Sequence, residues 1–188
     1  MENPYAGRAT LNPAFDSMEI AIPARRYWLI VVFLGFWLCC WLLGEIMVAG
    51  MLLAGKAPAV IGIFMFVWLG AWTAGGFFAF SMFWWMLQGK EVITIGQGRL
   101  TVEKRGLLFY KPKTYDLDEV KKVRVSPNEF VGWYGLRGAH YLGYFNTGII
   151  RFDYGLKTIN MAGGIDEAEA NYILEQLKSR RLLSDKNF

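Results

Sequence analysis

The 188-residue chain has very few of the residues from which active sites, metal centres and disulfide frameworks are built. It holds one histidine, His140, and two cysteines, Cys39 and Cys40, which are adjacent. Bonds between neighbouring cysteines are strained, so we expect both residues to be reduced and buried. The sequence also lacks a C-x-x-C pair, a nucleophile elbow, a phosphate-binding loop and a G-x-G-x-x-G motif. We therefore predict no enzyme activity, no cofactor and no metal site; a small enzyme that uses His140 is a remote alternative.

Charge is almost absent from a long stretch near the N-terminus. Two apolar runs, 27–54 and 59–87, contain Glu45 as their one charged residue. About 20 apolar residues are enough to cross a bilayer, and the short connection between the runs can reverse the chain but cannot form a domain. The pattern predicts a transmembrane helical hairpin at 27–87, preceded by a cytoplasmic N-terminal tail at 1–26.

The basic residues around the two runs indicate the orientation of the hairpin. Arg25 and Arg26 precede the first run and Lys90 follows the second, whereas the connection holds only Lys56. Lys and Arg near the ends of membrane spans favour the cytoplasmic side. We predict a multi-pass protein of the inner (cytoplasmic) membrane, with both termini in the cytoplasm.

The second run carries small residues at four-residue spacing, namely Ala71, Gly75 and Ala79. Small residues at this spacing let helix backbones approach closely in lipid. The row either packs against the first helix of the same chain, near Gly35 and Gly44, or forms a docking face for a helix of another protein. We favour packing within the chain.

Glu45 is the one charge inside the predicted spans, about 26 Å along a helix from Tyr27. An intramembrane carboxylate is a candidate proton site or ion-pair partner. Alternatively, the first span ends near Met47 and Glu45 reaches the outer membrane interface beside Lys56. We favour this second interpretation.

After the second run the hydrophobic pattern changes to the two-residue period of strands. Strands are predicted at 92–95, 100–104, 107–110, 113–117, 120–125, 149–153 and 156–161. A helix at 166–182 follows, with Asp166 as its N-cap and Glu169 able to complete a capping box. Its core-facing stripe is Ala170, Ile173, Leu174 and Leu177. Strands followed by one packed helix predict a cytoplasmic α+β domain at 90–188.

A two-span hairpin followed by short antiparallel strands and one closing helix resembles the bacterial membrane-anchored PH-like proteins. The residues that carry the resemblance are Val92–Ile95, Tyr115–Val120, Arg151–Gly155 and Gly164–Ala170. The resemblance implies a PH-like antiparallel β-barrel or sandwich capped by the C-terminal helix. The layout is also similar to the photosystem I assembly protein family, and this likeness implies an assembly or scaffolding role.

The irregular stretch 126–148 is rich in aromatic residues and glycines. Large rings spaced by glycines suit a membrane surface or a partner protein, but the stretch can equally hold one more strand that packs its rings into the core. The candidate contact residues are Phe130, Trp133, Tyr134, Tyr141 and Tyr144.

The formal net charge is +4, and the basic excess falls in the domain after the hairpin. Anionic headgroups attract such residues near a membrane, and the candidate headgroup contacts are Lys121, Lys122 and Arg124. No nucleic-acid-binding motif accompanies the charge, so no nucleic acid partner is expected. An acidic cluster is predicted to be a solvated turn rather than a weak cation site: Asp116, Asp118 and Glu119.

Taken together, these patterns predict a membrane-anchored, non-catalytic binding module in contact with the lipid bilayer. We expect an accessory, assembly or scaffold subunit that binds a membrane protein partner or a second copy of itself. The alternative is an anionic-lipid-binding or membrane-sensing protein that acts through its basic face and its aromatic stretch.

Overall fold

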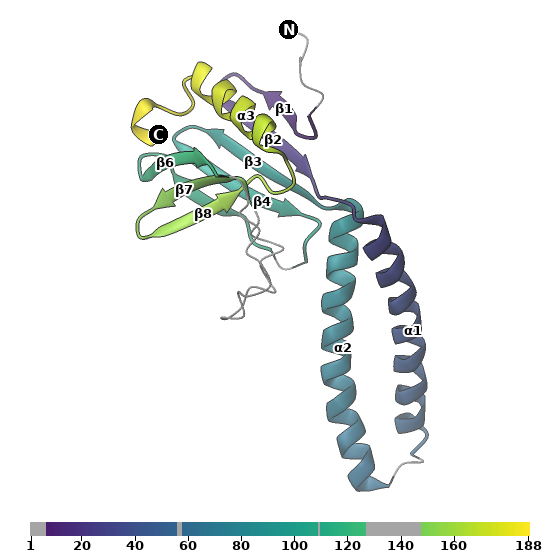
Figure 1. Cartoon of the computed structure of the whole chain (residues 1–188). Coiled ribbons are helices and arrows are strands. Elements are labelled where there is room, and N and C mark those ends of the chain that lie inside the picture. Colours follow the sequence, from purple (N-terminus) through teal and green to yellow (C-terminus); the bar gives the residue numbers. More distant parts are fainter. Residues whose placement is uncertain (1–6, 56–57, 109, 127–147) are drawn as a thin grey trace. The chain divides into compact units, whose positions relative to one another are not determined.

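A computed structural model of the chain describes residues 7–55, 58–108, 110–126 and 148–188. The described chain divides into two compact units. One unit consists of the helical hairpin, Arg25–Gln88, together with Gly106–Leu108, and the rest of the described chain forms the other. Figure 1 shows the two long helices of the first unit and the strands of the second.

The hairpin consists of α1, Trp28–Leu53, and α2, Ala59–Gln88. Both ends of each helix agree with the predicted bounds to within one residue. The two helices are long and apolar enough to cross a membrane, and very few of their side chains are buried in the isolated chain. The cysteines Cys39 and Cys40 are free, as predicted, but they lie exposed on α1 rather than buried.

The second unit is an α+β domain with eight described strands in two antiparallel sheets. The larger sheet contains β1 (Thr10–Pro13), β2 (Ser17–Pro23), β3 (Lys90–Gly96), β4 (Arg99–Arg105) and β5 (Lys113–Asp116), adjacent in that order. The smaller sheet contains β6 (Val120–Val125), β7 (Ile150–Tyr154) and β8 (Lys157–Met161). A helix, α3 (Glu167–Ser179), and a short 3-10 helix, η2 (Asp185–Asn187), follow.

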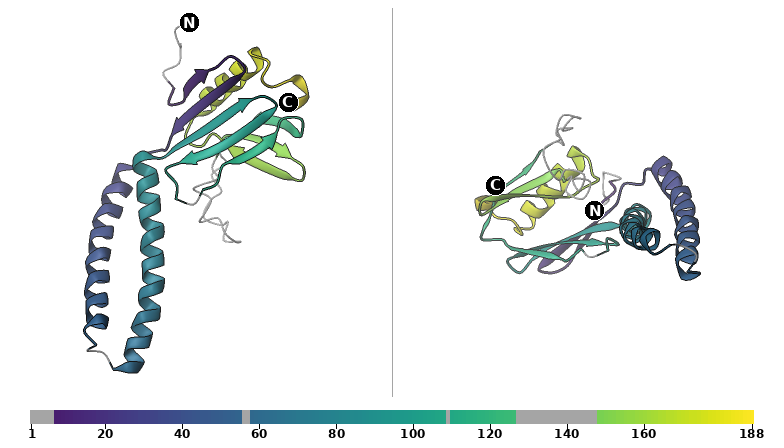
Figure 2. Two further views of the ribbon diagram at one scale, coloured as in Figure 1. Left: turned by 180° about the vertical axis from the view of Figure 1, so that it is seen from behind. Right: turned by 90° about the horizontal axis from the view of Figure 1, so that it is seen from below.

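The predicted N-terminal tail is wrong, because residues 10–23 supply two strands of the larger sheet. β2 pairs with β3 from Ser17 opposite Gly96 to Pro23 opposite Lys90. The side chains alternate along β2, so Met18, Ile20 and Ile22 point into the core and are almost completely buried. The view from behind in Figure 2 shows β1 and β2, in purple, continuing the sheet formed by teal β3 and β4. The hairpin is therefore inserted between two neighbouring strands of one domain.

The described strands do not close into a barrel, which corrects one of the two predicted forms. β5 is short, and directly after it the N–H of Asp118 donates to the side chain of Asp116, turning the chain out of the larger sheet. Among the described strands, β5 does not pair with β6 and β8 does not pair with β1. The predicted strand at 107–110 is also wrong, because Leu107 and Leu108 lie in a turn.

One hydrophobic core joins both sheets and α3. Ile93 and Leu100 of the larger sheet, Val123 and Phe152 of the smaller sheet and Ile173 of α3 belong to the same buried cluster. Three of the predicted stripe residues of α3 are buried (Ala170, Ile173 and Leu177), which confirms the predicted face. This shared core makes the two sheets and the helix one folded body.

Asp166 caps α3 as predicted. The side chain of Asp166 accepts the N–H of Glu169, as expected for an N-cap. The side chain of Glu169 also accepts the N–H of Ala9 at 2.5 Å. Arg8 donates to the carbonyl of Gly164 at 3.2 Å. Both contacts bind the N-terminal segment to the region around α3.

Candidate functional site

The two helices of the hairpin touch through an aromatic ring and a glycine. A Cβ placed on Gly76 would lie 2.0 Å from the Trp41 ring, so only glycine fits there. The Trp41 indole donates to the carbonyl of Trp72 at 3.3 Å. Gly35 of α1 lies against the ring of Phe83 on α2. Close contacts of this kind between a small residue and a ring stabilise a helix pair through packing.

Glu45 contributes the charged group of this hairpin, and its partner is on α2. The hydroxyl of Thr73 donates to one Glu45 carboxylate oxygen. The other oxygen, Oε2, is buried without a hydrogen-bond partner among the described residues. α1 continues to Leu53, about 12 Å of helix beyond Glu45. Glu45 is therefore an inward-facing residue of the helix pair. The position of Glu45 relative to the membrane interface stays a prediction.

The row of small residues does not form the contact between the two helices. Ala71 and Gly75 are exposed, Ala79 is half-buried, and a Cβ on Gly75 would meet nothing within 4 Å. A Cβ on Gly44 of α1 would also meet nothing. The close approach falls one residue further on, at Gly76. Whether the row packs against another protein stays a prediction, but α1 does not cover it.

The candidate headgroup residues Lys121, Lys122 and Arg124 are exposed on β6, an edge strand of the smaller sheet. The strand has an irregular register between Lys121 and Arg124, and Lys122 takes a positive φ of 51°. The guanidinium of Arg124 pairs with Asp153 at 3.4 Å. One of the three cations is therefore engaged within the domain.

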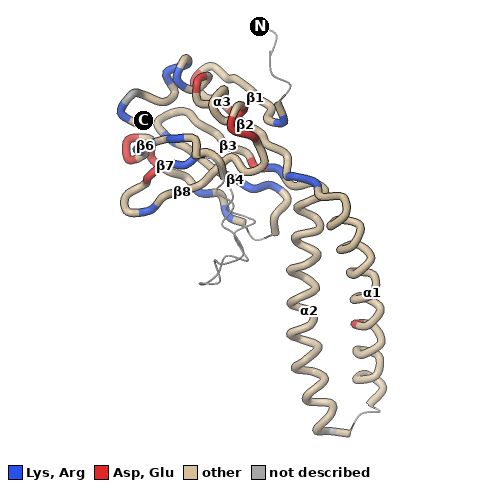
Figure 3. Tube along the Cα trace, in the orientation of Figure 1, with Lys and Arg blue, Asp and Glu red and all other residues tan. Residues whose placement is uncertain are grey.

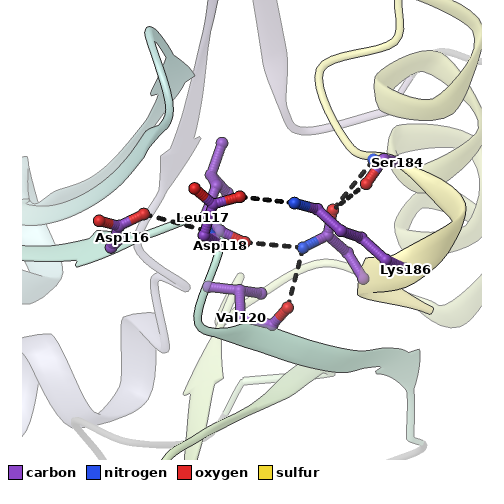
Figure 4. Close-up of polar contacts among 7 residues, drawn as sticks. Asp116, Leu117, Asp118, Val120, Ser184 and Lys186 are labelled. Carbon is purple, nitrogen blue, oxygen red and sulfur yellow. Dashed lines mark hydrogen bonds and ion pairs between the residues drawn. The ribbon is translucent and has the colours of Figure 1, made fainter.

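The acidic cluster forms the turn between β5 and β6 and binds the C-terminal segment. Asp118, which is largely exposed, pairs with the ammonium of Lys186 at 2.5 Å, and this contact lowers the pKa of Asp118. The side-chain amide of Asn187 donates to the carbonyls of Leu117 and Val120, each at 2.8 Å. Figure 4 shows these contacts between η2 and the turn. Among the described residues no group of His, Cys, Asp or Glu side chains is arranged to hold a metal ion.

A polar cluster that could not be identified from the sequence lies in the larger sheet, near the start of β3. Glu91 of β3 is 4% exposed, and its two carboxylate oxygens accept the N–H groups of Ala162 (3.2 Å) and Gly163 (2.9 Å). Its cross-strand neighbour is Lys104 of β4. Burial raises the pKa of Glu91, against the opposing effects of Lys104 and the two N–H groups. The carboxylate thus ties β3 to the segment between β8 and α3.

Lys104 is also one of two lysines that flank an aromatic ring. The ammonium groups of Lys104 and Lys113 each lie 5.7 Å from the centroid of the Tyr110 ring, within the range of a cation–π contact. Burial lowers the pKa of Lys104, and the charge of Lys113 lowers it further while Glu91 opposes the shift. Two cations therefore share one ring, with one carboxylate nearby. The alternation Leu100, Val102, Lys104 was a signal that Lys104 faces inward.

We expect Glu91→Gln to change how stability depends on pH. Because the pKa of Glu91 is raised on folding, its contribution to the free energy of unfolding is greatest below its ordinary pKa of about 4.3 and falls as pH rises through the folded value. The amide also loses one of two acceptors, which costs about 1–3 kcal/mol. Thermal melting of the full chain in mild detergent should show a wild-type advantage that shrinks with rising pH.

The matched control for this prediction is Glu175→Gln, an exposed carboxylate of α3. Its melting curve should follow that of the wild type throughout. A wild-type advantage over Glu91→Gln that stays constant with pH would contradict the assignment of a raised pKa to Glu91.

The aromatic candidates of the stretch 126–148 fall outside the described residues, and so does His140. These residues are Phe130, Trp133, Tyr134, Tyr141 and Tyr144. Their contact role and the alternative of a further core strand both stay predictions.

The chain was compared with protein families, curated proteins and solved structures. None of these comparisons finds a match. The resemblance to membrane-anchored PH-like proteins therefore stays a prediction, and the function has to be argued from the residues of this chain.

Proposed function

We propose that this chain is a membrane-anchored, non-catalytic binding module, an accessory, assembly or scaffold subunit of a membrane protein complex. One observation carries the proposal. Two apolar helices of membrane-spanning length connect β2 to β3, which are adjacent strands of one folded domain. Pro23 at the end of β2 lies opposite Lys90 at the start of β3. A hairpin of this kind holds the domain at a membrane surface through both of its helices.

The two ordinary explanations of long apolar helices do not fit this hairpin. The core helix of a soluble protein would be mostly buried, whereas only 6% of the apolar window of each helix is buried. A cleaved signal sequence would leave the chain together with the residues before it, but β2 places Met18, Ile20 and Ile22 in the core of the domain. A membrane is the environment that satisfies both observations.

The topology of the domain supports the proposed location of the termini. Residues 7–24 and 89–188 contribute to one domain, so both must lie on the same side of a membrane that the hairpin crosses. Arg25, Arg26 and Lys90 at this end favour the cytoplasmic side. We place both termini in the cytoplasm and propose that β3–β8 with α3 form a PH-like sandwich.

The exposed small residues of α2 support a partner in the membrane. Ala71 and Gly75 leave a face on which another helix can approach closely, and α1 does not cover it. The partner is a transmembrane helix of another protein or of a second copy. A second candidate function, anionic-lipid binding, is favoured by the basic residues around Tyr110.

Bulky substitutions on two faces of α2 test the proposal. Gly75→Leu should reduce co-purification of a membrane protein partner, or self-association, several-fold in mild detergent, because it fills the exposed face. Gly70→Leu is the matched control, since Gly70 is an exposed glycine on another face of the same helix. Quantitative mass spectrometry of the purified material measures both. A protein that purifies as a lone monomer, with no change in either variant, would contradict the accessory-subunit role and favour lipid binding.

A further inference from the structure

The β4–β5 connection, residues 106–112, has the residue order of a membrane-interface loop. Lys104 and Arg105 precede it, Leu107 and Leu108 form its apolar part, and basic residues return at its far end. Leu108 is 40% exposed, so a large apolar side chain faces solvent beside several cations. A lipid interface accepts both the leucines and the neighbouring cations.

The apolar part of the β4–β5 connection is associated with the hairpin. Gly106–Leu108 belongs to the compact unit of α1 and α2, although the residues on either side belong to the domain. The register agrees with this grouping, because Arg105 lies opposite Lys90, which comes two residues after the end of α2. If α2 crosses a membrane, this chain connectivity keeps Lys90 and Arg105 near the headgroups.

The cations of the loop exceed the acids that are available to neutralise them. Glu103 pairs with Arg105 at 3.0 Å, and both oxygens of Glu91 accept backbone N–H groups. Lys104 and Lys113 converge on the ring of Tyr110, and Lys111 is exposed. Figure 3 shows this basic segment at the strand ends, while α1 and α2 carry no Lys or Arg. A phosphate placed among these groups would offset the repulsion between the two ammonium groups.

We propose that the β4–β5 connection binds the headgroup of an anionic phospholipid, with Lys104, Lys111 and Lys113 around the phosphate and Leu107 and Leu108 in the lipid interface. The inference rests on the membrane attachment proposed above and names the lipid-contacting part of the domain. It replaces Lys121, Lys122 and Arg124 as the headgroup site. Burial raises the pKa of Tyr110, so its phenol stays protonated and can donate to a phosphate oxygen. The exposed Leu108 and the half-buried Leu107 favour a lipid over free phosphate, which has no apolar part.

The first experiment titrates the full chain in detergent with short-chain lipids and with phosphate. Dioctanoyl phosphatidylglycerol, dioctanoyl phosphatidylcholine and inorganic phosphate are added separately, and bound species are counted by native mass spectrometry. Phosphatidylglycerol should bind most tightly. The variant Lys111→Gln/Lys113→Gln should weaken that binding about tenfold or more, since each near-surface cation contributes substantially to the attraction. The control Lys121→Gln/Lys122→Gln removes the same charge from exposed positions on β6 and should change affinity less than about twofold.

Three results of the titration would overturn the proposal. Equal losses in the two double variants would make the attraction a general effect of net charge. Phosphatidylcholine binding as tightly as phosphatidylglycerol would remove the requirement for an anion. Inorganic phosphate binding as tightly as phosphatidylglycerol would remove the requirement for a lipid.

A second experiment tests the position of the leucines. In full-length protein with Cys39→Ala and Cys40→Ala, an environment-sensitive fluorophore is attached at Leu108→Cys or at Leu156→Cys, an exposed position on the turn after β7. In vesicles of phosphatidylcholine and phosphatidylglycerol, lipids carrying a quencher should quench the probe at position 108 and not at 156. Equal quenching would overturn the proposal.

Measurements on the same vesicles distinguish membrane attachment of the chain from lipid contact by the β4–β5 connection. Release of the wild-type chain by alkaline carbonate would overturn the membrane attachment itself. Retention of the chain, combined with equal quenching at both positions, would overturn only the role of the β4–β5 connection.

Discussion

A fragment of residues 89–188 should fail to fold, whereas the same residues joined to 7–24 should form a stable soluble domain. The reason is that β2 supplies Met18, Ile20 and Ile22, each no more than 1% exposed, to the shared core. Losing one large buried side chain costs about 2–5 kcal/mol, and a domain has only about 5–15 kcal/mol of stability. Loss of all three, together with the ladder between β2 and β3, exceeds what the remaining strands can supply.

The geometry at the ends of the hairpin shows how to make the soluble domain. The N–H of Ala24 donates to the carbonyl of Gly89 at 2.9 Å, so the two residues face each other across the sheet. An Asn-Gly pair placed between them should form the tight turn of a β-hairpin. Circular dichroism and thermal melting should show a cooperative transition for this protein, and none for 89–188 alone. The substitution Ile20→Asp in the joined protein should abolish the transition, whereas cooperative melting of 89–188 alone would contradict the assigned core.

The hairpin could be predicted from the sequence because its signal is local and strong. A run of apolar residues longer than a bilayer is thick needs no partner to be recognised, so the bounds of α1 and α2 agree closely with the predicted runs. The cap and the buried stripe of α3 were equally local: Asp166 lies three residues before the N–H that it accepts, and the stripe has the helical period.

The N-terminal strands could not be recognised in the same way because their partner is distant in the sequence. Ser17–Pro23 alternates as a strand does, but the segment is short and lies before the apolar runs, where a polar tail is the ordinary expectation. The strand that covers its edge, β3, begins only after both helices have been completed. Strand pairing is a long-range contact that local periodicity does not encode.

The same limit applies to the contact residues of the hairpin and to the polar cluster. Four-residue spacing showed that α2 has a row of small residues, but it could not show which face meets α1, and the contact is at Gly76 rather than Gly75. Glu91 is a single carboxylate in a strand, and its partners, Ala162 and Gly163, are more than 70 residues away. Only the folded sheet brings these groups together.

Phe152→Ala should cost about 3–5 kcal/mol of stability, because it empties a fully buried position where the two sheets meet. Phe152 lies on β7 of the smaller sheet, and its ring meets the edge of Tyr115 on β5 of the larger sheet, with centroids 5.2 Å apart. Aromatic pairs of this geometry add stabilisation beyond the area that they bury. Denaturant unfolding of the joined soluble domain measures the loss directly.

The control for this substitution comes from the same β7–β8 hairpin. Leu156 lies on the turn directly after β7 and is fully exposed, so Leu156→Ala should change the free energy of unfolding by less than about 0.5 kcal/mol. If Phe152→Ala cost no more than Leu156→Ala, the two sheets would not share a core. Among the described residues, the smaller sheet would then be held to the larger one by α3, the turn between β5 and β6, and the polar contacts of Asn187 and Glu91. A loss of several kcal/mol that is seen for Phe152→Ala and not for Leu156→Ala requires the Phe152 ring to be packed between the sheets. This packing joins the smaller sheet to the larger sheet, whose strands come from before and after the hairpin in the sequence.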